Sequence, residues 1–217
     1  MNKGIHVNKD WGRPEKVKAR QVSVFDSYRR LTGRQSIQSD RQYWSLCGLH
    51  QNEMCEFPQL LKSGIIQSPE QYHGVDCRED VITHNRSLYP KVHWHHDDFI
   101  DAMENAPDFN PGIVNFDVTS MVEKTCQMTA QILYMLIGLE ITDVFMVVNF
   151  LLNNPRRRVT LYNHPNDFFE LVNASPLCQE VFSEALDLGW RISPESYIYD
   201  GADSRAQTYL QTIHFIR

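Results

Sequence analysis

The chain has 217 residues, of which 42% are hydrophobic and 22% are charged, and its formal net charge at pH 7 is −6. This length suits one α/β domain, alone or with an extension, and the composition is that of an ordinary globular protein. No apolar run is long enough to span a membrane, and the polar first twenty residues lack an apolar signal core, so we expect a cytoplasmic protein without membrane contacts.

Cysteine usage and charge distribution narrow these expectations. The five cysteines are odd in number and scattered, and no two form a CxxC pair, which favours a reducing compartment and predicts neither a disulfide framework nor a zinc site. Residues 1–41 carry ten Lys or Arg against four Asp or Glu, whereas the remainder is strongly acidic. A basic arm of this kind can neutralise nucleic-acid phosphates, bind a protein partner, or simply be solvated.

The first predicted element is a helix within residues 23–37. Val24, Tyr28 and Leu31 have helical spacing, and Gly33 is a plausible end of the helix. Such a helix could cover a cleft as a lid or dock a partner. We interpret residues 1–41 as a basic, partly helical N-terminal extension and residues 42–217 as one domain.

From residue 42 onward, strand-like and helix-like segments alternate. Apolar or alternating patterns predict strands at 42–49, 71–77, 91–99, 112–120 and 143–152. Helices are expected between them, at 53–66, 78–89, 100–106 and 121–141. Helical pieces follow at 164–173 and 176–189, and the last 28 residues read as a β-hairpin that turns around the sequence DGADS.

This order of elements predicts an α/β fold with a seven-stranded, mostly parallel, doubly wound sheet and a C-terminal antiparallel hairpin. In such sheets ligands bind at the carboxyl ends of the strands, near the point where the strand order reverses. Asp76, Asp98 and Asp117 each follow a predicted strand, so we expect the three carboxylates to meet at one rim.

Two of these strand-end acids match parts of a nucleoside. An ionised carboxylate only accepts hydrogen bonds, so Asp76 suits the two hydroxyls of a ribose. Asp98 could accept from the exocyclic amine of adenine while Phe99 packs on the ring. The alternative is that each Asp starts a turn or caps the following helix, which is common at strand ends.

The stretches YWSLCGLHQNE, GVDC, HHDDF and NFDVTS, together with the terminal hairpin, resemble the class I S-adenosylmethionine-dependent methyltransferases over about residues 42–217. The resemblance implies S-adenosylmethionine as the cofactor and a methyl transfer as the reaction. It also implies roles for particular residues. The implied cofactor contacts are Cys47 and Gly48 in the first turn, Asp76 and Cys77 at the ribose, and Asp98 and Phe99 at the adenine. The implied residues near the methyl group are Asn115 and Asp117.

Parts of the chain depart from that family's pattern. The first turn keeps only Gly48 of the usual GxGxG, NFDVTS is not an NPPY-type motif, and no Pro-Cys pair follows the fourth strand. A non-catalytic methyltransferase-like subunit that binds nucleic acid or a protein therefore remains an alternative. An NAD-type Rossmann enzyme is a third alternative. The missing GxGxxG motif and the C-terminal hairpin argue against it.

The stretch HWHHDD raises the question of a metal. His93 and His95 share one face of a strand, and His96 and Asp98 share the other, whereas a zinc site needs three or four ligands. We therefore expect no metal. A histidine at the rim, for which we choose His96, could serve acid–base chemistry together with Asp117 and Asn115.

The stretch NNPRRR follows the fifth long strand. Asn149 near the end of that strand and the three arginines Arg156, Arg157 and Arg158 could hold the phosphates of a substrate, or the arginines could form a solvated loop. With the basic N-terminal arm, this stretch predicts that the methyl acceptor is a nucleic acid.

Overall fold

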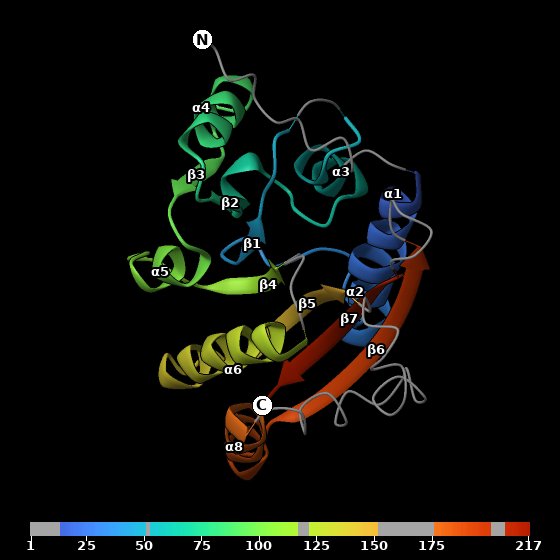
Figure 1. The fold of residues 1–217 in the computed structure, drawn as a ribbon, viewed down its shortest axis with the longest axis vertical. Coiled ribbons are helices and arrows are strands. Elements are labelled where there is room, and N and C mark those ends of the chain that lie inside the picture. Colours follow the sequence, from blue (N-terminus) through green and yellow to red (C-terminus); the bar gives the residue numbers. More distant parts are fainter. Residues whose placement is uncertain (1–13, 51–52, 117–121, 152–175, 201–206) are drawn as a thin grey trace.

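The structure is a computed structural model that describes residues 14–50, 53–116, 122–151, 176–200 and 207–217. Its centre is a seven-stranded sheet in the order β3-β2-β1-β4-β5-β7-β6 (Figure 1). The strands are β1 (Gln42–Leu46), β2 (Tyr72–Asp76), β3 (His93–His96), β4 (Pro111–Phe116), β5 (Asp143–Leu151), β6 (Arg191–Asp200) and β7 (Gln207–Ile216).

The sheet has the predicted direction of strands. β1 to β5 are parallel to one another, whereas β7 runs antiparallel to both β5 and β6. The strand order reverses between β1 and β4, because β2 and β3 extend the sheet on one side and β4 and β5 on the other. The predicted fold class, a mostly parallel sheet with an antiparallel terminal hairpin, is confirmed.

Helices occupy the connections, as expected from the alternating pattern (Figure 1). They are α1 (Pro14–Arg20), the π-helical η1 (Gln21–Asp26), α2 (Ser27–Thr32), α3 (Glu56–Ser63), the short η2 (Pro69–Gln71), α4 (Glu79–Leu88), α5 (Phe99–Glu104), α6 (Val122–Gly138) and α8 (Pro176–Asp187). Gly33 and Gly64 end α2 and α3 in the left-handed conformation, with φ of 70° and 74°, where glycine carries no steric penalty. Among the residues described, no helix has both the length and the apolar character that crossing a membrane requires.

Each face of the sheet has its own apolar core. Trp44, Val114 and Met146 point to the face covered by α5, α6 and α8. On the opposite face, Tyr43 and Phe145 pack with residues of α2 and α3. The alternation of side chains along each strand thus feeds two cores, which is why the strands read as nearly continuous apolar runs.

The N-terminal helices lie along β7 and β6 (Figure 1). Tyr28 of α2 packs edge-on against Phe145, with ring centroids 5.4 Å apart. Arg30 donates to Glu195 of β6, and Arg34 lies 2.5 Å from Asp143 of β5. Residues 14–34 therefore form one layer of the described fold; the proposed boundary at residue 41 stays a prediction.

Two predicted strands are shorter than expected. The first strand ends at Leu46 rather than residue 49, because residues 47–50 turn into the protein, where they are buried. β3 has four residues rather than nine, since Asp98 already caps α5. β4 is described to Phe116. The helical piece predicted at 164–173 lies outside the described residues.

Candidate functional site

The carboxyl ends of β1, β2 and β4 form a rim beside the point between β1 and β4 at which the strand order reverses. Asp76 is the last residue of β2 and is partly buried there. Its Oδ1 accepts from the backbone N–H of Arg78 at 2.9 Å and from Arg78 Nε at 3.4 Å. Burial raises the pKa of the Asp76 carboxyl against the opposing effect of Arg78. Its Oδ2 has no hydrogen-bond partner within the described ranges, so one acceptor remains for a ligand.

Hydrogen bonds from α4 hold the turn that follows β1. Asn85, fully buried on that helix, donates from Nδ2 to Gly48 O at 3.0 Å and accepts from the His50 N–H at 2.8 Å. Burial lowers the pKa of His50 to about 4, so its ring is neutral. The backbone of residues 48–50 is thus held without the flexibility that a run of glycines would supply.

A buried carboxylate lies beneath this turn. Glu56, the first residue of α3, is 1% exposed, and its two oxygens accept four hydrogen bonds. Oε1 accepts from Tyr43 at 2.8 Å and from Asn115 Nδ2, and Oε2 accepts from Ser45 at 2.5 Å and Tyr72 at 2.9 Å. The four donors come from β1, β2 and β4, so one side chain ties α3 to the three strands that meet at the rim.

Sequence reasoning missed Glu56, Asn85 and Arg20. Arg20 of α1 is 7% exposed and donates to Met54 O at 3.1 Å and Gln59 Oε1 at 3.0 Å, which joins the N-terminal helix to the region between β1 and α3. An acid at a helix start and an Asn inside a helix have ordinary local explanations. Only the burial of these side chains, which depends on the fold, distinguishes them.

Two residues predicted to bind adenine, Asp98 and Phe99, and Cys77, predicted at the ribose, differ in their burial and contacts. Asp98 caps α5, since its Oδ1 accepts from Ile100 N at 3.0 Å, as the capping alternative expected. Phe99 is 2% exposed and lies in the core near Phe116, with ring centroids 6.3 Å apart. Cys77 is exposed, and its carbonyl accepts from Nε2 of His96 at 3.1 Å. The cofactor roles of these residues stay predictions.

The predicted catalytic and substrate residues are only partly described. Asn115 and Asn149 are buried on neighbouring strands and face the same side, because Asn115 is paired with Val147. Among the residues that the structure describes, the Oδ1 atom of each has no hydrogen-bond partner. Asp117 and the arginines at 156–158 lie outside the described residues.

Within the described residues, neither a cysteine nucleophile nor a metal ion is supported. Burial raises the pKa of the Cys47 thiol well above its usual value, and nearby Asp76 adds to the effect, so Cys47 is not a ready nucleophile. No group of three or more His, Cys, Asp or Glu side chains within the described ranges is arranged to hold a metal ion.

A comparison with solved structures identifies the architecture. The structure of TYW2 from M. jannaschii in complex with AdoMet matches with a TM-score of 0.55 at 12% sequence identity, covering 94% of this chain and 77% of that one. The fold is that of the class I methyltransferases. The resemblance read from the sequence motifs is thus confirmed at the level of fold.

Other methyltransferase structures match more loosely. The 23S rRNA methyltransferase ErmE has a TM-score of 0.43 at 11% identity, covering 86% of this chain and 66% of that one. The N-methyltransferase NodS from Bradyrhizobium japonicum WM9 has a TM-score of 0.41 at 13% identity, covering 91% and 99%. The sequence matches no family model and no curated protein.

Proposed function

We propose that this protein is an S-adenosylmethionine-dependent methyltransferase. The observation that carries the proposal is the partly buried Asp76 at the end of β2, one strand from the reversal point of a class I methyltransferase fold. One of its carboxylate oxygens is unpartnered among the described residues. The TYW2 structure of this fold holds AdoMet. A carboxylate in this position suits the hydroxyls of the cofactor's ribose.

The chain's residues would divide the work of binding. Asp76 accepts from the ribose hydroxyls, and the turn at Cys47 and Gly48, held by Asn85, lies under the methionine part. Asp98 keeps an oxygen beyond the one that caps α5, which could accept from the adenine amine.

The reaction itself is an in-line displacement. The acceptor's lone pair forms a bond to the methyl carbon as the bond from that carbon to sulfur breaks, and sulfur leaves as a neutral thioether. Positioning supplies most of the rate enhancement, and a base is needed only where the acceptor carries a proton. Asn115 would orient the acceptor, and His96 or Asp117 would receive the proton.

We further propose a nucleic acid as the methyl acceptor. Of the ten basic residues in 1–41, five arginines already contact the protein itself: Arg20, Arg29, Arg30, Arg34 and Arg41. The phosphate contacts are therefore assigned to the remaining five, Lys3, Lys9, Arg13, Lys16 and Lys18, and to Arg156, Arg157 and Arg158.

The absence of paired cysteine motifs in the sequence supports a cytoplasmic location.

A non-catalytic methyltransferase-like subunit is the second candidate. The observation that favours it is the turn after β1, where Leu49 and His50 are buried in place of the glycines that let a backbone approach a cofactor. Such a protein would keep the fold and use its basic segments to bind nucleic acid or a protein.

Calorimetric titration with S-adenosylmethionine and S-adenosylhomocysteine tests the cofactor site. Asp76→Asn keeps the size and the Oδ1 acceptor but replaces the free oxygen by a donor, so we expect binding to weaken by about 10- to 100-fold. Asp187→Asn, at an exposed acid on the last turn of α8, is the matched control and should bind like the wild type.

Three results would separate the candidates. Binding that only Asp76→Asn weakens, followed by label transfer from the cofactor to RNA or DNA, supports the enzyme. Binding without transfer to any nucleic acid or protein acceptor contradicts the enzymatic proposal. No binding by the folded wild type favours the non-catalytic subunit.

A further inference from the structure

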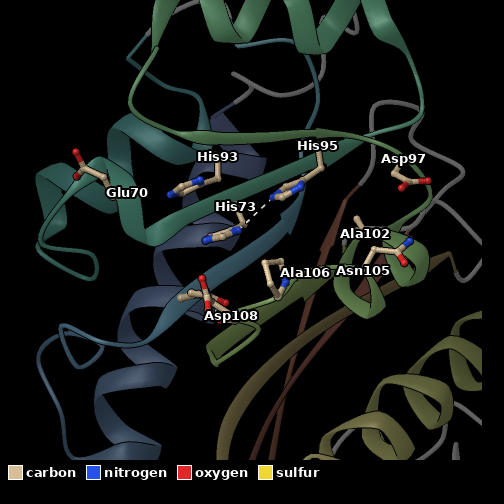
Figure 2. Close-up of a pocket in the computed structure, with 11 residues that line it drawn as sticks. Glu70, His73, His93, His95, Asp97, Ala102, Asn105, Ala106 and Asp108 are labelled. Carbon is tan, nitrogen blue, oxygen red and sulfur yellow. Dashed lines mark hydrogen bonds between the residues drawn. The ribbon is translucent and has the colours of Figure 1, made fainter.

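A cavity lies beside β2 and β3 (Figure 2). It is on the face of the sheet opposite Glu56, because Tyr72 contacts Glu56 whereas the next residue, His73, lines the cavity. Its volume is about 420 Å³, within the range of small-molecule sites. Glu70 precedes β2 and Asp108 precedes β4, so the cavity reaches the amino ends of these strands, whereas Asp76 lies at a carboxyl end. Asp97 follows the carboxyl end of β3 beside Asp98, but none of the residues proposed to contact the cofactor lines the cavity.

One wall of this cavity consists of three imidazoles (Figure 2). His73 of β2 is 8% exposed, and its Nδ1 lies 3.1 Å from Nε2 of His95 on β3. The His93 ring stacks on His73 with centroids 4.5 Å apart, and Trp44 stacks behind His73 at 4.4 Å. The His73 ring thus stacks with both His93 and Trp44, which leaves its edge for the cavity.

The two bonded imidazoles are neutral. Burial, with the neighbours His93 and His95, lowers the pKa of His73 to about 3, and burial also lowers the pKa of His95. A neutral imidazole has one N–H and one lone pair. Because His73 and His95 share one hydrogen bond, their two remaining nitrogens present one donor and one acceptor in either tautomer. Neither nitrogen has a partner among the described residues.

The charged groups of the cavity are all acidic. Carboxylates of Glu70, Asp97 and Asp108 line it, together with the amide of Asn105, and no Lys or Arg does. The backbone N–H of Asp98 donates to one oxygen of Asp97, but within the described ranges the Asp108 carboxylate has no hydrogen-bond partner. A cavity with three carboxylates and a buried imidazole acceptor favours a positively charged ligand that carries several N–H donors.

The ring geometry argues against a metal ion as that ligand. The planes of His73 and His95 lie within 14° of parallel, and those of His73 and His93 within 19°. His73 and His95 direct lone pair and proton at each other, so the three nitrogens do not converge on one point as tetrahedral zinc requires. A ligand that bonds to ring edges one at a time fits this wall better.

We propose that this cavity binds a small organic cation with amine or guanidinium groups. The ligand's N–H donors would reach the carboxylate of Asp108 and the free acceptor of the His73–His95 pair, with Asp97 or Glu70 opposite the far end. Asp108 and His73 contribute most, because Asp108 is unpartnered among the described residues and His73 is the most buried of the three histidines.

Calorimetric titration with agmatine and putrescine tests the proposal, with 1,4-butanediol as the uncharged counterpart of putrescine. Asp108→Asn, an exposed position that should fold, is expected to weaken cation binding by about 10-fold or more. His73→Gln tests the imidazole wall. Asp101→Asn removes an exposed acid of α5 that does not line the cavity, and it should bind like the wild type.

The titrations distinguish a specific cation site from general electrostatic attraction and from a metal site. Binding of the amines but not of the diol, lost in Asp108→Asn and kept in Asp101→Asn, supports the site. Equal weakening in both variants indicates general attraction to an acidic protein and overturns the proposal, as does no binding up to about 10 mM. Zinc binding that requires His73, without amine binding, would replace the proposal by a metal site.

Discussion

The polar side chains on the two faces of the sheet at β1 and β2 differ in how completely they are hydrogen-bonded. On the face toward α3, Glu56 is buried among four donors, and both of its oxygens are satisfied. On the face toward α5, His73 and His95 satisfy only each other, and their remaining nitrogens adjoin a cavity.

The difference separates a structural role from a binding role. A buried polar group that is fully hydrogen-bonded holds elements together and offers nothing to a ligand. A buried group with an unused donor or acceptor beside a cavity retains binding capacity, at some cost to stability. By this criterion Glu56 stabilises the rim, whereas His73 and the free oxygen of Asp76 are the groups that we propose to bind ligands.

The largest expected effect comes from removing the satisfied carboxylate. Glu56→Ala leaves the hydroxyls of Tyr43 and Tyr72 buried without their acceptor, and Asn115 keeps only the Tyr43 oxygen, so the free energy of unfolding should fall by at least about 3 kcal/mol. Glu56→Gln keeps one oxygen and should cost less, because hydroxyls can turn to accept from the new amide. Urea unfolding measures both; equal stability of Glu56→Ala and the wild type would refute the structural role.

A substitution at Gly74 tests packing on the same face. A Cβ there would lie 2.4 Å from Cζ3 of Trp94 and 3.0 Å from the ring of Tyr72. Gly74→Ala should therefore destabilise the protein by about 2–3 kcal/mol, since both rings are held in the core. Gly138→Ala, where nothing lies within 4 Å, is the control, and a similar loss in both variants would contradict the packing argument.

The imidazole face should respond to pH. The pKa of His73 is about 3 in the folded protein against 6.5 for the free group, so below pH 6.5 the unfolded chain binds a proton that the folded protein does not. Stability should then fall as pH is lowered from 7.5 to 5, with His73 contributing about 2 kcal/mol. His73→Gln should show a flatter dependence in urea unfolding; an unchanged slope would mean that His73 is not buried neutral.

The smallest effect is expected where the N-terminal helices join the sheet. Burial would raise the pKa of Asp143, but hydrogen bonds from His214 and Arg34 outweigh it, and the pKa is lowered. This contribution is present above the ordinary pKa of 3.8 and lost as pH falls through the folded value. Asp143→Asn should cost about 1 kcal/mol at pH 7, since Arg34 is partly exposed. At pH 2 the variant and the wild type should unfold at similar urea concentrations.

Much of the fold was predictable from local pattern. The apolar run of β5 and the glycine stops at Gly33 and Gly64 gave elements close to those observed, because hydrophobic period and glycine conformation act within a few residues. Element ends were less predictable. The first strand stops at Leu46 because Asn85, 39 positions further along the chain, holds the following turn.

The candidate site was predictable only in outline. Asp76 could be placed at the rim because parallel strands bring their carboxyl ends together. Alternation along the strand could place His93 and His95 on one face. Their partner His73 lies on another strand, and only the register between β2 and β3 brings it beside them. Phe99 was predicted to contact a ligand from its place beside a strand end, and only the fold shows that it is 2% exposed in the core. Its contact with a cofactor stays a prediction.

The sequence by itself determined the class of fold, the strand-end acids and the surplus of positive charge in the first 41 residues, because each depends on composition or on spacing along the chain. Tertiary structure decided which of these groups remain free. Five of the early arginines are turned to internal contacts, Glu56 is saturated by four donors, and His73 is left beside a cavity. Burial and hydrogen-bond partners arise between segments far apart in sequence, so only the folded chain specifies them.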